Sequence, residues 1–267
     1  MANNKARHPF RRRVRPGVEA MPEVEISEAD GIRSLHLGSE TVQSSMNLDD
    51  PTDLVLSYSR AMMGFLLFNA DPAHILQIGL GGGSLSRFID FYLRDTKSVA
   101  VDINPQVIAV ARAFFELPEE GERFEIIEAD GADYVKIFRD STDVILVDGF
   151  DGLQIVDALT TEDFFEDCRR ALTEDGIFVT NWWSGDKRYM AFLERLLGVF
   201  EGRVLELPAA SHGNVAVMAF NSMPKLTRWA ALEKRADELE RRFGLEFGEF
   251  VSRMRLMNPQ GERCLNP

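Results

Sequence analysis

The chain contains little cysteine and little histidine, with two cysteines and four histidines in 267 residues. Cys168 and Cys264 lie far apart along the sequence, and neither they nor the scattered histidines show the short spacing of metal-binding motifs. We therefore expect no metal site.

Long apolar runs are also missing. No segment approaches the ~20 apolar residues that a membrane-spanning helix needs. The N-terminal residues contain no apolar stretch of the signal-peptide kind. We therefore expect a cytoplasmic protein without a membrane partner.

Positive charge is in the minority, because 30 lysines and arginines face 43 acidic residues and leave a net charge of −13. This balance argues against nucleic acid as a partner and suits a cationic substrate, although solubility alone accounts for the acidity of most acidic proteins. Residues 1–16 are the exception, since they contain basic residues and no acid. Such a run predicts a solvated, disordered tail over 1–19.

The remaining sequence has the composition of a globular protein, with 45% hydrophobic residues. Short strands separated by turn residues predict a small β-rich domain over 20–53. Strands then alternate with helices over 54–222, the strands at 75–79, 98–102, 124–128, 143–148, 177–182 and 215–220, and the helices at 54–68, 84–93, 105–116, 131–138, 161–172 and 187–199. This alternation predicts an α/β fold, a doubly wound, mainly parallel Rossmann-like sheet covered on both faces.

The end of the chain departs from this alternation. Residues 203–207 and the last strand follow one another closely, which predicts an antiparallel hairpin that closes the sheet. Residues 223–267 form a predicted helical extension. Its first helix, over 225–243, is highly charged with one apolar stripe, and we expect it to pack outside the core.

A glycine-rich turn directly follows the strand at 75–79. Gly79, Gly81, Gly82 and Gly83 allow a sharp turn and a close approach of backbone to ligand. An acid, Asp102, ends the next strand about 20 residues downstream, where such an acid accepts hydrogen bonds from ribose hydroxyls. The combination predicts a nucleoside-binding domain.

Further polar residues follow the next two strands. Asp130 and Gly131 come after the third strand, and Asp148 and Asp151 come after the fourth. In an open α/β sheet, ligands bind beyond the carboxyl ends of the strands, so these residues are expected to share one site. Simpler roles stay open: Asp102 and Asp130 could cap helices, and Asp148 and Asp151 could be ordinary turn residues.

In order and spacing, these motifs resemble S-adenosylmethionine-type transferases and, more narrowly, the polyamine aminopropyltransferase family, the spermidine synthases. Residues 78–83 (Ile-Gly-Leu-Gly-Gly-Gly) are similar to the family's Ile-Gly-Gly-Gly-Asp-Gly, and residues 129–132 (Ala-Asp-Gly-Ala) to its Gly-Asp-Gly-Ala. Residues 147–151 (Val-Asp-Gly-Phe-Asp) resemble Val-Asp-Ser-Ser-Asp. Gln43 lies in a match to Val-Ile-Gln-Ser, and Tyr58 matches the tyrosine of Tyr-His-Glu-Met.

The resemblance implies an S-adenosylmethionine-transferase sheet and a role for each motif. The glycines and Asp102 would hold the nucleoside of the co-substrate, and Asp130 and Gly131 its adenine. Asp148 would be the general base, and Asp151 would help it to hold the substrate, with Gln43 and Tyr58 along the substrate channel. The implied co-substrate is decarboxylated S-adenosylmethionine, the implied acceptor is a small amine such as putrescine, and the implied assembly is a homodimer.

The chemistry is consistent with this assignment. An amine with a pKa near 10 is protonated and not nucleophilic at neutral pH. A carboxylate can bind the ammonium and accept its proton as the nitrogen attacks a sulfonium carbon. Because the sulfonium is already a good leaving group, no metal is required.

Three departures from the family pattern keep other functions open. Gly82 stands where the family has an aspartate that contacts the aminopropyl amine. Ser59 and Arg60 replace the histidine and glutamate after the tyrosine, and Phe150 and Gly152 alter the motif around Asp151. An S-adenosylmethionine-dependent methyltransferase, which uses the intact co-substrate, and a non-catalytic nucleoside-binding relative are therefore the alternatives.

Overall fold

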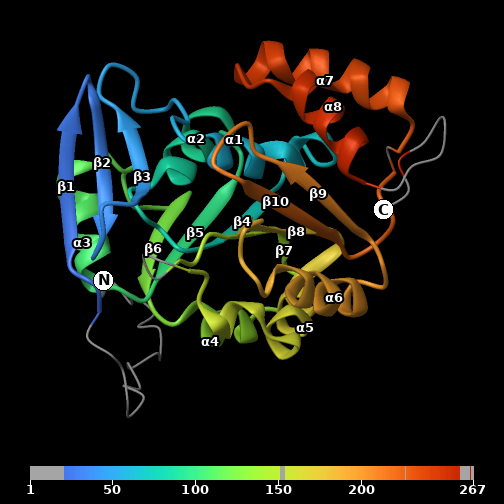
Figure 1. The fold of residues 1–267 in the computed structure, drawn as a ribbon, viewed down its shortest axis with the longest axis horizontal. Coiled ribbons are helices and arrows are strands. Elements are labelled where there is room, and N and C mark those ends of the chain that lie inside the picture. The colour runs from blue at the N-terminus through green and yellow to red at the C-terminus, as the bar shows by residue number, and fades with distance from the viewer. Residues whose placement is uncertain (1–20, 151–153, 226, 259–264, 266–267) are drawn as a thin grey trace, which may run out of the picture.

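A seven-stranded sheet forms the centre of the molecule, whose computed structural model describes residues 21–150, 154–225, 227–258 and 265 (Figure 1). The strand order is β6-β5-β4-β7-β8-β10-β9. The strands are β4 (His74–Ile78), β5 (Lys97–Asp102), β6 (Phe124–Glu128), β7 (Thr142–Val147), β8 (Leu172–Trp183), β9 (Val204–Pro208) and β10 (Asn214–Phe220).

The first five of these strands are parallel, and β10 pairs antiparallel with both β8 and β9. The predicted mainly parallel sheet and its closing hairpin are thus confirmed. From β4 the chain continues to β5 and β6 on one side and then crosses to β7 and β8 on the other. This reversal opens a crevice at the carboxyl ends of β4 and β7, the position at which such sheets bind ligands.

Helices cover both faces of the sheet, as expected for parallel strands with apolar residues on each side (Figure 1). One face is covered by α1 (Ser57–Met62), η1 (Met63–Leu67), α2 (Ser84–Tyr92), α3 (Pro105–Phe114), α7 (Trp229–Phe243) and α8 (Phe247–Met257). The other face is covered by α4 (Gly131–Tyr134), η2 (Val135–Ile137), η3 (Asp157–Thr160), α5 (Glu162–Ala171) and α6 (Tyr189–Val199).

A separate three-stranded antiparallel sheet precedes the central sheet and confirms the predicted N-terminal β-rich piece. It consists of β1 (Val24–Ala29), β2 (Ile32–Leu37) and β3 (Val42–Asn47). Leu35 and Met46 from this sheet bury themselves against Phe115, at the end of α3. The sheet therefore lies beside the β6 edge, on the left of Figure 1. The predicted domain boundaries at 53/54 and 222/223 stay predictions.

The prediction that the helix over 225–243 packs outside the core was wrong. Trp229 and Phe243 of α7, together with Phe247 and Phe250 of α8, belong to the largest hydrophobic core of the protein, and each is at most 3% exposed. The two helices form a hairpin over η1 and β9 (Figure 1). Most charged residues of α7 are exposed, so a high charge content did not prevent the apolar stripe from joining the core.

Candidate active site

The glycine turn after β4 is shaped by contact with β7. Gly79 has a φ of +95°, and a Cβ at this position would lie 2.1 Å from the carbonyl oxygen of Asp148. The amide of Asp148 also donates a hydrogen bond of 2.8 Å to the carbonyl of Ile78. Only glycine therefore lets the ends of β4 and β7 approach this closely.

Asp102 ends β5 beside this turn. Its Oδ2 accepts a 2.9 Å hydrogen bond from the amide of Leu80, and its Oδ1 accepts one of 2.8 Å from the amide of Asn104. Burial raises its pKa, and these backbone hydrogen bonds oppose the rise. The helix-capping alternative for Asp102 was wrong, because the side chain of Asn104 caps α3 by accepting from Gln106.

Asp130 and Gly131 follow β6. The side chain of Asp130 caps α4, since its Oδ1 accepts a 2.9 Å hydrogen bond from the amide of Ala132. It lines the same cavity as Asp102, so the capping role and a binding role can coexist. A Cβ on Gly131 would lie 2.3 Å from Ile78, which explains why glycine stands at the start of this helix.

Asp148 follows β7 and faces Asn181 of β8. The amide nitrogen of Asn181 donates a 3.0 Å hydrogen bond to its Oδ1. Burial raises the pKa of Asp148, and the hydrogen bond from Asn181 counteracts the shift. A carboxylate with a raised pKa is a better proton acceptor than an ordinary aspartate.

Tyr58 reaches this carboxylate from α1. Its hydroxyl donates a 2.8 Å hydrogen bond to the backbone carbonyl of Gln43 in β3. Burial and the charge of Asp148 raise the pKa of Tyr58 well above its ordinary value. The tyrosine therefore stays protonated and ties the N-terminal sheet to the end of β7.

Two cavities meet at these residues. The first, of about 220 Å³, lies over the glycine turn and is called the loop cavity here. It is lined by Gln43, Ser44, Tyr58, Gly79, Leu80, Gly81, Asp102, Asp130, Gly131 and Asp148, among others. The second, of about 900 Å³, is called the tryptophan cavity and is lined by Asn181, Trp182, Trp183, Asp186, Arg188, His212 and Asn214, among others. Gln43, Tyr58, Asp148 and Phe150 line both.

The structure thus brings eight of the predicted site residues to one cavity and sets others apart. Gly82 and Gly83 do not line either cavity. A Cβ on Gly82 would lie 2.8 Å from the ring of Phe115 and 2.9 Å from Ser44 Oγ, so the acid of the family motif would not fit without a shift. Asp151 lies outside the described residues.

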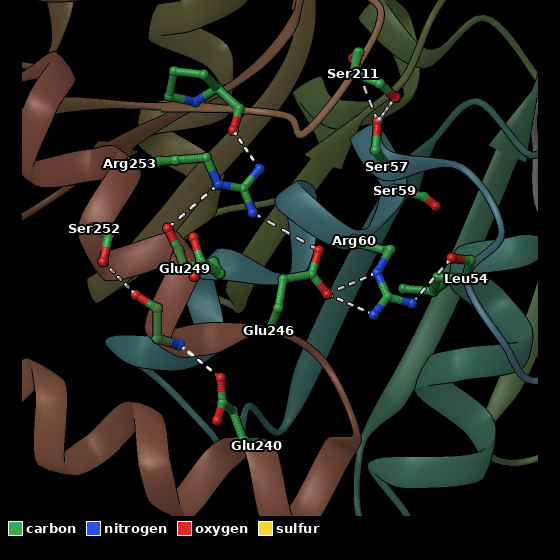
Figure 2. Close-up of polar contacts among 12 residues, drawn as sticks. Leu54, Ser57, Ser59, Arg60, Ser211, Glu240, Glu246, Glu249, Ser252 and Arg253 are labelled. Carbon is green, nitrogen blue, oxygen red and sulfur yellow. Dashed lines mark hydrogen bonds and ion pairs between the residues drawn. The ribbon is translucent and has the colours of Figure 1, made fainter.

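Arg60 lines neither cavity, and its side chain points toward Glu246 (Figure 2). Its guanidinium donates to Glu246 Oε2, at the start of α8, over 2.5 and 2.8 Å, and its Nη1 lies 3.3 Å from the carbonyl oxygen of Leu54. Although burial opposes the shift, hydrogen bonding from Arg60 holds the pKa of Glu246 below its ordinary value. The charge of Arg60 is therefore paired with that of Glu246, outside both cavities.

Asn181 and Asn214 are site residues that the sequence analysis missed. They lie on neighbouring strands, β8 and β10, and both line the tryptophan cavity. The signal that could have identified Asn181 is its place at the carboxyl end of a core strand, like Asp102 and Asp148. The sequence analysis did not use this signal, because two tryptophans follow Asn181 directly in the same strand.

In the described residues, no group of three or more histidine, cysteine, aspartate or glutamate side chains could hold a metal ion. Within the same part of the chain, no helix is long and apolar enough to cross a membrane.

The central sheet and its crevice define a doubly wound α/β protein of the class that binds ligands at the carboxyl ends of its strands. Residues 55–192 match the family model described as spermine/spermidine synthase domain. Polyamine aminopropyltransferases of Chromobacterium violaceum and Neisseria meningitidis are 81% and 69% identical, and each alignment covers 95% of this chain and 97% of the relative. The chain therefore belongs to the spermine/spermidine synthase family and is an aminopropyl-transferring enzyme.

Solved structures show the same fold at low identity. A probable spermidine synthase from Corynebacterium glutamicum superposes with a TM-score of 0.68 at 21% identity, covering 80% of this chain and 83% of that one. A spermidine synthase in complex with the transition state analogue AdoDATO gives 0.61 at 22%, covering 86% and 84%. Human methyltransferase-like protein 13 in complex with SAH gives 0.58 at 22%, covering 77% and 90%.

Proposed function

We propose that this protein transfers the aminopropyl group of decarboxylated S-adenosylmethionine to putrescine or a similar small amine. The observation that carries the proposal is the meeting of two cavities at Asp148. A two-substrate transfer needs one site for the donor, one for the acceptor, and a proton acceptor where the two substrates touch.

The loop cavity suits the nucleoside of the donor. Asp102 accepts hydrogen bonds from the ribose hydroxyls, and Asp130 and Gly131 bind the adenine at the start of α4. Gly79 and Gly81 supply backbone that a ligand can approach closely. The cavity contains no cationic side chain among its described lining residues, which favours a donor without a carboxylate over intact S-adenosylmethionine.

The tryptophan cavity suits the acceptor amine. Its ammonium binds at the junction between Asp148 and Tyr58, and its carbon chain lies along Trp182 and Trp183. Gln43 lines the channel between the two cavities. Asp151 is proposed to hold the cation together with Asp148, on the basis of its place in the motif.

The proposed reaction is a single displacement. The acceptor nitrogen loses a proton to Asp148 and attacks the methylene carbon next to the sulfonium. The carbon–sulfur bond breaks, its electron pair remains on sulfur, and methylthioadenosine leaves as a neutral thioether. The protein contributes the proton acceptor and the alignment of nitrogen, carbon and sulfur, and alignment alone supplies a large part of many rate enhancements.

The first test is a product assay with purified protein. Incubation with decarboxylated S-adenosylmethionine and putrescine should form spermidine and methylthioadenosine in equal amounts, and Asp148→Asn should abolish both. Turnover only with S-adenosylmethionine, with formation of its demethylated product, would show a methyltransferase instead. Failure of all these ligands to bind in calorimetry would leave a non-catalytic relative.

We also propose that the protein is a cytoplasmic homodimer that assembles through β1–β3. This sheet supplies Leu37, Gln43 and Ser44 to the loop cavity, so contacts that hold it in place also hold the donor site. Light scattering coupled to gel filtration measures the mass directly. A monomeric mass at micromolar concentration would contradict the proposal.

A further inference from the structure

Two asparagines form a hydrogen-bonded chain that ends on Asp148. Asn214 Nδ2, at the start of β10, donates a 3.0 Å hydrogen bond to Asn181 Oδ1. Asn181 Nδ2 in turn donates a 3.0 Å hydrogen bond to Asp148 Oδ1. Asn181 is only 2% exposed, whereas Asn214 is half-buried at the edge of the tryptophan cavity.

The direction of this chain has a chemical consequence. An asparagine amide has an acceptor oxygen and a donor nitrogen of nearly equal size, so its orientation follows from its hydrogen-bond partners. If the amide of Asn181 turned over, its oxygen would face the carboxylate of Asp148, and two acceptors would meet. In the arrangement that the structure shows, Asn214 opposes this, because its amide nitrogen donates to the oxygen of Asn181.

We propose that Asn214 is a positioning residue that acts through Asn181, by holding the amide of Asn181 with its nitrogen toward the carboxylate of Asp148. The inference rests on the proposed function, in which Asp148 takes the proton of the acceptor amine. An amide cannot accept that proton, so the chain orients the carboxylate without competing for it. Asn181 also stabilises the charged form of Asp148, the form that accepts a proton.

Other groups around Asp148 could also influence its protonation. The described titratable residues that share a cavity with it are Tyr58 of α1, Asp102 and Asp130 in the loop cavity, and Asp186, Lys187, Arg188 and His212 in the tryptophan cavity. Tyr58 is protonated, and Arg188 is paired with Asp186 at 2.7 Å. A test must therefore separate an effect carried by Asn181 from a direct effect of charge.

The experiment compares Asn214→Asp with Asn214→Ala, each in the native chain and in an Asn181→Ala background. A carboxylate at position 214 attracts the amide nitrogen of Asn181 and so reverses its orientation, whereas alanine merely stops orienting it. We expect Asn214→Asp to lower kcat by about 10- to 100-fold, the size of a lost hydrogen bond to a charged group. We expect Asn214→Ala to lower kcat by only about 3-fold, less than one neutral hydrogen bond.

The Asn181→Ala background shows whether the effect of the substitution at position 214 on kcat is carried by Asn181. In Asn181→Ala there is no amide left to turn, so Asn214→Asp should change kcat by less than about 2-fold. The acidic limb of the pH profile should move to higher pH in Asn181→Ala and in Asn214→Asp. Melting temperature and calorimetric binding of methylthioadenosine show that each variant is folded and binds in the loop cavity.

Three results would overturn the proposal. The first is an equal loss of kcat from Asn214→Asp in both backgrounds, which indicates direct charge repulsion. The second is a rise in KM for putrescine with kcat and the pH profile unchanged, which indicates simple contact with the acceptor. The third is native activity in Asn214→Asp.

Two further results stay interpretable. If Asn214→Asp does not fold, the Asn214→Ala and Asn181→Ala cycle replaces it: a double variant equal to Asn181→Ala supports the chain, and additive losses overturn it. Absence of spermidine with the unmodified protein overturns the proposed function and this inference together. Activity of the unmodified protein with additive losses overturns this inference alone.

Discussion

Replacing Gly79 by alanine should damage the site more than any comparable change at a turn. The backbone there has a φ of +95°, which costs a residue with a Cβ roughly 1–2 kcal/mol. The new Cβ would lie 2.1 Å from the carbonyl oxygen of Asp148, which is backbone and not a flexible side chain. To reach an ordinary van der Waals distance, the ends of β4 and β7 must separate by more than an ångström.

That separation removes the 2.8 Å hydrogen bond between Asp148 and Ile78, at about 1 kcal/mol. Together with the backbone term, the total loss of stability is about 2–3 kcal/mol, or roughly 4–12 °C in melting temperature. A displacement of about 1 Å at the reacting groups costs on the order of 100-fold in kcat. We therefore expect a folded, less stable and nearly inactive protein.

Gly202→Ala is the matched control. Gly202 has a φ of +80°, but a Cβ there would meet nothing within 4 Å. Its cost is thus the backbone term alone, about 1–2 kcal/mol, and its kcat should be native. Thermal melting and spermidine production measure both variants. If Gly79→Ala matches Gly202→Ala in both quantities, the close approach of the two strands does not shape the site.

Four further predictions concern charge and the altered motif. Asp148→Asn should abolish activity but raise the melting temperature at pH 7. The buried carboxylate has a raised pKa, so at a pH above that pKa its charge destabilises the folded state. An unchanged or lower melting temperature contradicts this. For the same reason kcat should fall as pH drops through a value above the ordinary pKa of aspartate, and a profile that stays flat down to that pKa argues against Asp148 as the base. Glu246→Gln should destabilise the protein by about 1–2 kcal/mol in chemical denaturation, because Arg60 and Glu246 are only 24% and 29% exposed. Lys225→Ala, which removes one partner of an exposed ion pair, should have almost no effect. Equal effects of the two substitutions would show that burial of the pair is irrelevant. Gly82→Asp should lower stability rather than improve donor binding, as seen by melting and calorimetry, because its Cβ meets Phe115; tighter binding would refute this.

Much of the fold could be predicted from local patterns. Apolar runs of strand length alternate with helical stretches, and that alternation alone requires a parallel sheet with two helical layers. The glycine turn and Asp102 could be located in the same way, because a turn after a strand and an acid at a strand end are properties of a few consecutive residues. The N-terminal sheet was similarly visible from its turn residues.

The roles of individual polar side chains were harder to predict. Asp102 and Asn104 are both plausible caps for α3, and only the backbone geometry shows that Asn104 is the cap. Asp130 is a cap and also lines a cavity, two properties that no local pattern separates. Arg60 pairs with Glu246, 186 residues away, and a contact of that range leaves no local signal.

The sequence by itself therefore determined the element types, the sheet class and the strand ends that carry acids, because these depend on the spacing of neighbouring residues. Only the tertiary structure decided which of those residues meet. The packing of α7 and α8 into the core, the pairing of Arg60 with Glu246, and the chain from Asn214 through Asn181 to Asp148 all join segments distant in sequence. Such contacts arise when strands pair and helices pack, so their partners become defined only once the chain has folded.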